Sequence, residues 1–140
     1  MSAMATGTQA LIARYYAAFN RADWEGMLEL LADDVVHDLN QGERQYGRER
    51  FGVFLQQMAR CYLEVLSEVR VLVSEDGRHA AAEYIVSGQY LQAHAELPSA
   101  RGQRYRLSGG AFFDVVDGRI ARVSNHYNLS DWIAQVSRLD

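Results

Sequence analysis

The spacing of apolar residues changes once along this chain, near Tyr62, and that change limits the folds that the chain can adopt. Before it, apolar residues recur every three or four positions, as in Phe51, Phe54, Leu55 and Met58, which is the period of an amphipathic helix. After it, apolar and polar residues alternate, which is the period of a strand. Helices followed by a run of strands are typical of the α+β class, in which helices pack on an antiparallel sheet.

Capping and turn residues divide the chain into its expected elements. Thr6 followed by Gln9 fits a capping box at the start of the first helix. Asp23 is a suitable N-cap for the second helix, which would end at residues 33–34. Asp117-Gly118 is a strong hairpin turn. We expect one domain over residues 1–140, with helices that begin near residues 6, 23, 48 and 130, and strands at 35–39, 65–73, 80–90, 104–116 and 119–127.

Alternation along the long strands predicts which side chains point toward the core. The even-numbered residues of the strand at 80–90 form its more apolar face, and we expect this face to be buried. The same reasoning places Asn125 inward and His126 outward. Four tyrosines are also predicted to point inward: Tyr84, Tyr90, Tyr105 and Tyr127. The expected result is an aromatic cavity that contains a few polar groups.

Composition excludes several kinds of site. All fourteen basic residues are arginine, so neither a lysine Schiff base nor a phosphate-binding lysine can form. The single cysteine, Cys61, excludes internal disulfides and cysteine-based zinc sites. The four histidines show no metal-ligand spacing, and a net charge of −4 with scattered arginines argues against nucleic acid. No apolar run approaches the length of a membrane span. We therefore expect a cytoplasmic protein with no bound metal or other cofactor.

The element order and four short motifs resemble the ketosteroid isomerase branch of the nuclear transport factor 2-like superfamily, which includes the SnoaL-like polyketide cyclases. The motifs are Arg14-Tyr15, Phe19-Asn20, Trp24-Glu25-Gly26 and Leu31-Ala32-Asp33-Asp34. The resemblance covers nearly the whole chain. It implies a cone of curved sheet with N-terminal helices packed on its concave face. It also implies a pocket inside the cone and a dimer formed through the outward face of the sheet.

The resemblance also implies two catalytic residues. The family tyrosine on the first helix and the family aspartate on the first strand match Tyr15 and Asp38 in this sequence. In ketosteroid isomerases, the aspartate moves a proton next to a carbonyl group and the tyrosine stabilises the enolate oxygen. A second acid of that family corresponds to Ala111 here, and alanine cannot donate a hydrogen bond. The segment at 37–42 instead looks like a subgroup described as steroid isomerase-related, whose reaction the resemblance does not supply.

The orientation of Asp38 decides how this resemblance is interpreted. Asp38 and His37 are neighbours on a predicted strand, so only one of them can point into the cavity. The apolar pattern favours Val36, Asp38 and Asn40 on the inward face, with His37 outward. A carboxylate at a core-facing position costs free energy unless it is paired or used, which favours catalysis. The alternatives are that Asp38 caps the following turn and that Asn40 is an ordinary turn residue.

These observations predict a small-molecule pocket protein, most simply a cofactor-independent enzyme that transfers a proton next to a carbonyl, as an isomerase or aldol cyclase does. Asp38 would be the base, and Tyr15 would donate to the substrate oxygen. Substrate-binding residues would be Asn40, Tyr84, Tyr105, Asn125 and Tyr127. The alternatives are a non-catalytic binding or dimerisation module, and hydratase, dehydratase or epoxide hydrolase chemistry. The expected partners are a small apolar or carbonyl-bearing molecule and a second copy of the chain, with neither nucleic acid nor membrane.

Overall fold

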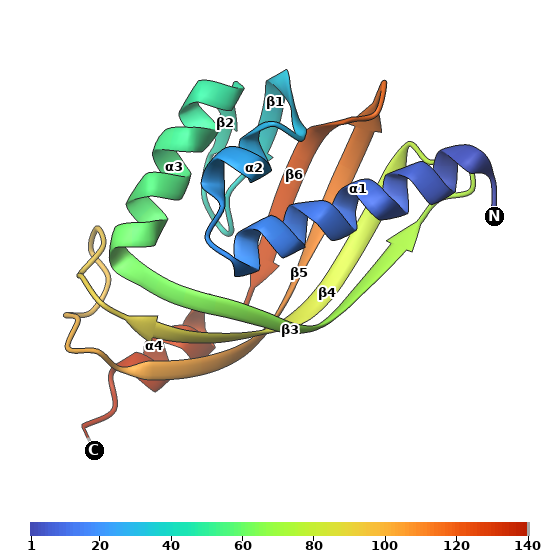
Figure 1. The fold of residues 1–140 in the computed structure, drawn as a ribbon. Coiled ribbons are helices and arrows are strands. Elements are labelled where there is room, and N and C mark those ends of the chain that lie inside the picture. Colours follow the sequence, from blue (N-terminus) through green and yellow to red (C-terminus); the bar gives the residue numbers. More distant parts are fainter. Residues whose placement is uncertain (140) are drawn as a thin grey trace.

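A computed structural model describes residues 1–139 and confirms the α+β class (Figure 1). The helices are α1 (Ala3–Asn20), α2 (Trp24–Leu28), α3 (Arg48–Cys61) and α4 (Leu129–Val136). The strands are β1 (Leu31–Asp38), β2 (Arg44–Tyr46), β3 (Tyr62–Val73), β4 (His79–Tyr90), β5 (Arg104–Val116) and β6 (Arg119–Tyr127). No helix within residues 1–139 is both long and apolar enough to cross a membrane.

Six strands form one strongly curved sheet in the order β2-β1-β6-β5-β4-β3. Neighbouring strands are antiparallel except for β1 and β6, which run parallel. Figure 1 shows α1 and α3 lying over one face of the bent sheet, while α4 lies at the opposite end from α2. The predicted cone, with helices on its concave face, is therefore the observed architecture.

Local details at the element ends differ from the predictions. The cap of α1 is Ser2, whose hydroxyl accepts from the Ala5 backbone N–H, so the helix begins earlier than Thr6. Asp23 caps α2 as expected. The second helix ends before residues 33–34, which lie inside β1 instead. The cap of α4 is Asn128 rather than Ser130. Each difference moves a boundary by a few residues, which is the usual uncertainty at helix ends.

The predicted alternation along the long strands is confirmed. Gly88 pairs with Tyr105, and Tyr84 pairs with Gly109, across β4 and β5. A Cβ at either glycine would overlap the ring of its paired tyrosine. The two glycines therefore leave room for two phenol rings to lie flat over the concave face. The core of the molecule lies between this face and the helices α1 and α3.

Candidate functional site

The carboxyl group of Glu64 lies on the concave face, and the sequence analysis did not identify it. Glu64 pairs with Gly88, and it shares its face with Tyr62 and Leu66. The Tyr105 ring extends over Gly88, and its hydroxyl donates a hydrogen bond of 2.5 Å to Glu64 Oε2. A bond from a hydroxyl to an ionised carboxylate is shorter and stronger than a bond between two neutral groups. The strands β3 and β5, which lie on either side of β4, thus place an acid and a potential base in direct contact.

Burial shapes the acid–base chemistry of this pair. Loss of solvent raises the pKa of Glu64 above its ordinary value, and the hydrogen bond from Tyr105 partly opposes that rise. Burial also raises the pKa of the Tyr105 phenol, with a further contribution from the charge of Glu64. Both effects arise because charge is unfavourable in an apolar interior. Glu64 is therefore a stronger base, when ionised, than an exposed carboxylate.

Three further phenols surround the same carboxyl group. Burial is the main cause of the raised pKa of Tyr62, Tyr84 and Tyr127, and the charge of Glu64 raises each pKa further. The pKa of Tyr84 rises to about 12. These phenols remain protonated at neutral pH, so they can donate hydrogen bonds to a ligand. The predicted inward direction of Tyr84, Tyr105 and Tyr127 is confirmed, although Tyr127 is 40% exposed at the rim of the concave face.

Aromatic rings enclose the end of the concave face beside Glu64. Tyr62 and Tyr90 stack with their centroids 5.5 Å apart, and Trp132 of α4 meets both rings edge-on. Trp132 also contacts the Tyr105 ring edge-on at 5.9 Å. This packing covers one side of the Tyr105 ring, and a lower local dielectric strengthens the hydrogen bond that its hydroxyl makes.

A second polar cluster joins β1 to β6. The imidazole of His37 is 1% exposed and stacks on the Phe51 ring of α3 at a centroid distance of 4.2 Å. The Asn125 amide nitrogen lies 3.0 Å from His37 Nε2. Burial lowers the pKa of His37 to about 4, against the opposing charge of Asp38, so the ring is neutral at pH 7. Asn125 points inward as predicted, but its neighbour there is a histidine that was predicted to point outward.

Asn40 lies just after β1, at the same end of the sheet. Its Oδ1 atom accepts a hydrogen bond of 3.0 Å from the backbone N–H of Tyr127. Its Nδ2 atom is buried and has no hydrogen-bond partner within residues 1–139. Asn40 therefore does more than form a turn, because it ties the segment after β1 to the end of β6.

The predicted orientation of Asp38 is wrong. Its carboxylate lies on the convex face, where Arg44 donates hydrogen bonds of 2.6 and 3.0 Å and Arg122 donates one of 3.1 Å. The Asp38 side chain is 23% exposed. The bond from Arg44 is the main reason that the pKa of Asp38 lies below its ordinary value, and Arg122 adds to the effect. A carboxylate held ionised by two arginines is a weak base.

The face assignment failed because the segment 35–39 was too short to fix the alternation. In the structure β1 begins at Leu31, and its register with β6 shifts between Leu31 and Val36. After this shift the fully buried residues are Val35 and His37, which puts the odd-numbered residues of this part of β1 inward. Stacking on Phe51 lets the imidazole of His37 lie inward among core residues, although it was predicted to point outward.

The structure does not bring Tyr15 and Asp38 together. Tyr15 is 5% exposed and packs edge-on against Tyr16 and Phe113, between α1 and the concave face. Burial, with a smaller contribution from Tyr84, raises the pKa of Tyr15. Because Asp38 lies on the other face of the sheet, the two side chains cannot act on one substrate. Ala111, at the position of the family's second acid, is buried and pairs with Asn125.

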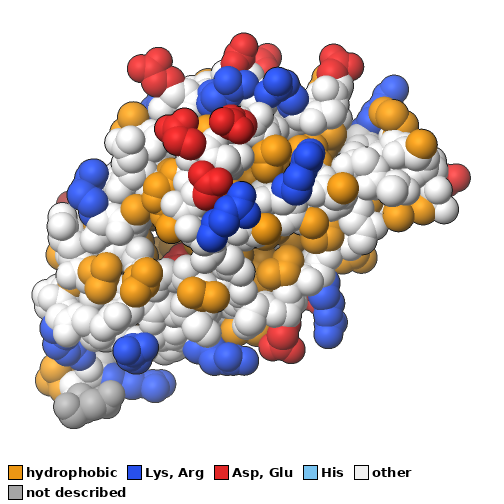
Figure 2. Space-filling model, in the orientation of Figure 1, with side chains coloured by type: hydrophobic (Ala, Val, Ile, Leu, Met, Phe, Trp, Pro, Cys, Tyr) orange, Lys and Arg blue, Asp and Glu red, His pale blue; other side chains and the backbone are white. Residues whose placement is uncertain are grey.

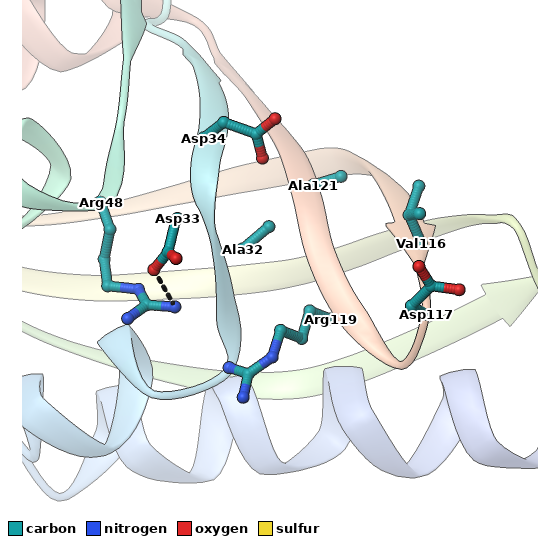
Figure 3. A pocket seen from close by; sticks show the side chains of 8 residues that line it. All are labelled: Ala32, Asp33, Asp34, Arg48, Val116, Asp117, Arg119 and Ala121. Atoms are coloured by element: carbon teal, nitrogen blue, oxygen red, sulfur yellow. Dashed lines mark ion pairs between the residues drawn. The ribbon is translucent and has the colours of Figure 1, made fainter.

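Figure 2 shows a hollow between α3 and the C-terminal end of α1, with acidic atoms visible inside it. A separate surface hollow of about 600 Å³ lies at the other end of the molecule, between the start of β1 and the β5–β6 turn (Figure 3). It contains the Arg48–Asp33 ion pair, at 2.9 Å, and other charged side chains. Within residues 1–139, no cluster of three His, Cys, Asp or Glu side chains could hold a metal ion. Small-molecule sites are lined mostly by apolar side chains, whereas the second hollow is lined mostly by charged ones, so the first hollow is the better candidate.

Comparisons with known proteins agree with the fold. The family model of the SnoaL-like domain matches residues 12–123. A crystal structure named "putative polyketide cyclase", from Xanthomonas campestris pv. campestris, is 51% identical. It covers 96% of this chain and 100% of its own, with a TM-score of 0.93. A second structure with that name, from Pseudomonas putida KT2440, is 53% identical and covers 91% of this chain and 96% of its own, with a TM-score of 0.90.

A third structure, named "putative ketosteroid isomerase" and from Kribbella flavida, is 28% identical. It covers 89% of this chain and 79% of its own, with a TM-score of 0.66. A search of curated proteins finds no significant match.

Proposed function

The chain belongs to the SnoaL-like domain family, and from that premise we propose that it is a cofactor-independent enzyme that moves a proton next to a carbonyl. Its substrate is a small, largely apolar carbonyl compound. Glu64 is the general base, in place of the Asp38 that the sequence favoured. One observation carries this proposal: a half-buried carboxyl group lies in contact with a phenol on the concave face of the sheet.

The proposed step follows from the environment of Glu64. The carboxylate takes a proton from the carbon next to the carbonyl, and the electrons of that C–H bond move onto the carbonyl oxygen to give an enolate. Glu64 becomes a neutral acid, which an apolar environment favours over the carboxylate. It can then return the proton to another carbon, which completes an isomerisation with no net change in atoms. Tyr105 holds the carboxyl group in place by donating a hydrogen bond to it.

The enolate also leads to a second outcome. Its carbon can attack another carbonyl of the same molecule, which closes a ring in an aldol reaction. The two relatives at 51% and 53% identity are both named polyketide cyclases, and that similarity favours ring closure for this chain. The substrate in that case carries at least two carbonyl groups.

Hydrogen–deuterium exchange tests the base. A panel of small cyclic and aryl ketones is incubated with protein in D₂O, and exchange at the α-carbon is followed by NMR. We expect Glu64→Gln to lower the exchange rate by about 10²-fold or more, the usual contribution of a general base. Asp38→Asn is the matched control and should keep the wild-type rate within about threefold. The reverse result would restore Asp38 as the base, and no exchange by the wild type would favour a non-catalytic binding protein.

We further propose that two copies of the chain associate through the convex face of the sheet. Several large apolar side chains are exposed on that face: Leu63, Val65, Leu72, Phe112 and Val116. The Arg70–Glu83 ion pair, which joins β3 to β4, adds charges of both signs beside these apolar residues. In sedimentation the wild type should be a dimer at tens of micromolar and Phe112→Asp a monomer. A monomeric wild type contradicts this proposal.

A further inference from the structure

The hydroxyl of Tyr62 meets the imidazole of His94 at the aromatic end of the concave face. Tyr62 is the first residue of β3, and His94 lies in the segment 91–103, which joins β4 to β5. The Tyr62 hydroxyl oxygen lies 3.2 Å from His94 Nδ1. Histidine is the side chain that ordinarily changes its charge between about pH 5 and pH 8. The contact therefore joins a residue of the concave face to a group that can titrate near neutral pH.

Neighbouring groups hold both rings in place. The Tyr62 ring stacks on the Tyr90 ring at a centroid distance of 5.5 Å and meets Trp132 edge-on at 6.0 Å. The His94 backbone N–H donates to the Tyr90 hydroxyl at 3.2 Å, and this hydroxyl donates to the Pro98 carbonyl oxygen at 2.7 Å. The imidazole meets the Tyr62 ring edge-on at 6.0 Å. With the rings fixed, a proton at this contact can change position without a rearrangement of the chain.

Tyr62 borders the hollow that lies between α3 and the C-terminal end of α1. β3 follows α3 directly, and its first part passes just below this hollow when Figures 1 and 2 are compared in their common orientation. Tyr62 and Glu64 share the concave face, and both residues are half-buried, so part of each contacts solvent. A ligand that places a carbon atom beside Glu64 can therefore also reach the Tyr62 hydroxyl.

The protonation state of His94 sets the direction of the Tyr62 O–H bond. A phenol is a stronger donor than an imidazole N–H, and an imidazole nitrogen is a stronger acceptor than a phenol oxygen. In the neutral ring, Nδ1 therefore accepts from Tyr62, and the lone pairs of the phenol oxygen remain available. In the protonated ring both nitrogens are donors, so Nδ1 donates to the phenol oxygen and the phenol hydrogen points elsewhere. The Tyr62 oxygen is thus a good acceptor only while His94 is neutral.

The titratable groups around this contact are mostly phenols. Burial is the main cause of the raised pKa of Tyr62, and smaller contributions come from Tyr127, Tyr90, Cys61 and Glu64. Tyr62 therefore stays protonated throughout the range in which histidine titrates. Tyr90 faces His94 from β4, and Glu96, in the same segment as His94, is exposed. Glu64 is the group whose titration an experiment must separate from that of His94.

We propose that Tyr62 and His94 determine substrate specificity by binding a hydroxyl group of the substrate while His94 is neutral. The Tyr62 oxygen accepts from this hydroxyl, because the hydrogen of Tyr62 is engaged with His94. The inference rests on the proposed function for the carbonyl compound, and it adds that this compound also carries a hydroxyl group. Protonation of His94 makes the Tyr62 oxygen a poorer acceptor, so the preference for a hydroxyl weakens as pH falls.

Two matched ketones test the pair without any reaction. The para-hydroxymethyl and para-ethyl derivatives of acetophenone have nearly the same shape, and they differ in whether the substituent ends in a hydroxyl or a methyl group. Neither ketone titrates in the range in which histidine does. Calorimetry measures both affinities, and their ratio removes effects that the two ligands share. We expect the ratio of hydroxymethyl to ethyl affinity to be about fivefold larger at pH 8 than at pH 5, as for one neutral hydrogen bond.

Three variants assign this change to the pair. Tyr62→Phe removes the acceptor and His94→Ala removes the titrating ring, so the ratio should not depend on pH in either variant. His79→Ala is the matched control, because it removes an imidazole that lies 3.0 Å from Asp114 on the convex face, and it should keep the fivefold change. If His94→Ala does not fold, Tyr62→Phe carries the same test, since it leaves the bond between His94 and Tyr90 in place.

The remaining outcomes keep this inference separate from the proposed base. Glu64→Gln should keep the pH-dependent ratio, and loss of the pH dependence in this variant would make Glu64 the titrating group and overturn the inference. A wild type that binds neither ketone, or binds them with a pH-independent ratio, overturns it as well. A pH-independent ratio together with loss of hydrogen exchange in Glu64→Gln would refute the pair but keep the base. A pH-dependent ratio that Tyr62→Phe abolishes, with exchange retained in Glu64→Gln, would do the opposite.

Discussion

Glu64 and Asp38 carry the same functional group on opposite faces of one sheet, and their surroundings differ in every respect. Glu64 faces rings and phenols, and its pKa is raised. Asp38 faces two guanidinium groups near solvent, and its pKa is lowered. The lesson is that a carboxyl group's chemistry is set by the face of the strand on which it lies. In this chain the arginines stabilise the convex face, while the concave face keeps a basic carboxylate.

The largest change in stability is expected when the space that the Tyr105 ring occupies is filled. In Gly88→Ala the added methyl group overlaps the Tyr105 ring and the hydroxyl that reaches Glu64. We expect a loss of about 2 kcal/mol in the free energy of unfolding, as for other overpacked sites. Gly7→Ala is the control, since nothing lies within 4 Å of that position in α1, and it should stabilise slightly. Equal unfolding midpoints in urea for the two variants would show that the ring does not lie over Gly88.

The second test removes the phenol that supports the concave carboxyl group. Tyr105→Phe deletes the hydrogen bond that lowers the pKa of Glu64, so this pKa should rise further. Carbon-13 NMR of labelled glutamate measures it directly. The unfolding free energy should fall by about 1.5 kcal/mol, typical of a bond to a charged group. An unchanged Glu64 pKa would mean that the phenol and the carboxyl group are not in contact.

The third test compares the pH dependence of the two faces. The pKa of Asp38 is lowered in the folded state, so its stabilising effect exists above the unfolded pKa near 4 and disappears as pH falls. Asp38→Asn should therefore cost about 1 kcal/mol at pH 7 and nothing near pH 2. Thermal unfolding across this pH range provides the measurement.

Glu64 should behave in the opposite way. Its pKa is raised on folding, so the wild type loses stability as pH increases from the unfolded pKa to the folded pKa. Glu64→Gln removes that loss, and its stability relative to wild type should improve as pH rises above the unfolded pKa near 4. Parallel pH curves for the two variants would contradict the contrast between the faces.

The smallest expected effect is the response to salt. Ion pairs near solvent weaken as ionic strength increases, because mobile ions screen them. The destabilisation caused by Asp38→Asn at pH 7 should fall by roughly half between 0.05 and 1 M sodium chloride. The effect of Tyr105→Phe should not change, since that contact is enclosed by rings. Equal salt sensitivity would place both carboxyl groups in similar surroundings.

Much of this contrast could be predicted from the sequence. Long alternating segments fixed the faces of β4, β5 and β6, and the inward positions of Tyr84, Tyr105, Asn125 and Tyr127 followed from them. The helix predicted to begin near residue 48 does begin at Arg48. In a strand of nine or more residues, one atypical residue does not change which face the alternation assigns to the core.

Two errors account for what the sequence did not reveal: one in which residues of a strand point inward, and one in where a strand begins. The predicted strand at 35–39 contained too few residues to fix its alternation, and an irregular register precedes it. Glu64 was missed because the third strand was expected to start at Val65, whereas it starts at Tyr62. Alternation extended back through Tyr62, Glu64 and Leu66 would have placed the carboxyl group inward. The pairing with Tyr105 still depends on a contact 41 positions away, which no local pattern contains.

The parallel pairing of β1 with β6 has a consequence for how the protein folds. Its contacts join distant parts of the chain: His37 and Asn125 are 88 positions apart, and Asn40 and Tyr127 are 87 apart. Closing so long a loop costs chain entropy before any contact compensates for it, and such topologies fold slowly. On a ribosome, β1 must wait for β6 to be synthesised before the two strands can pair. We expect the side chains of His37 and Asn40 to reach their final positions only in the last stage of folding, after the hairpins of β3, β4 and β5 have formed.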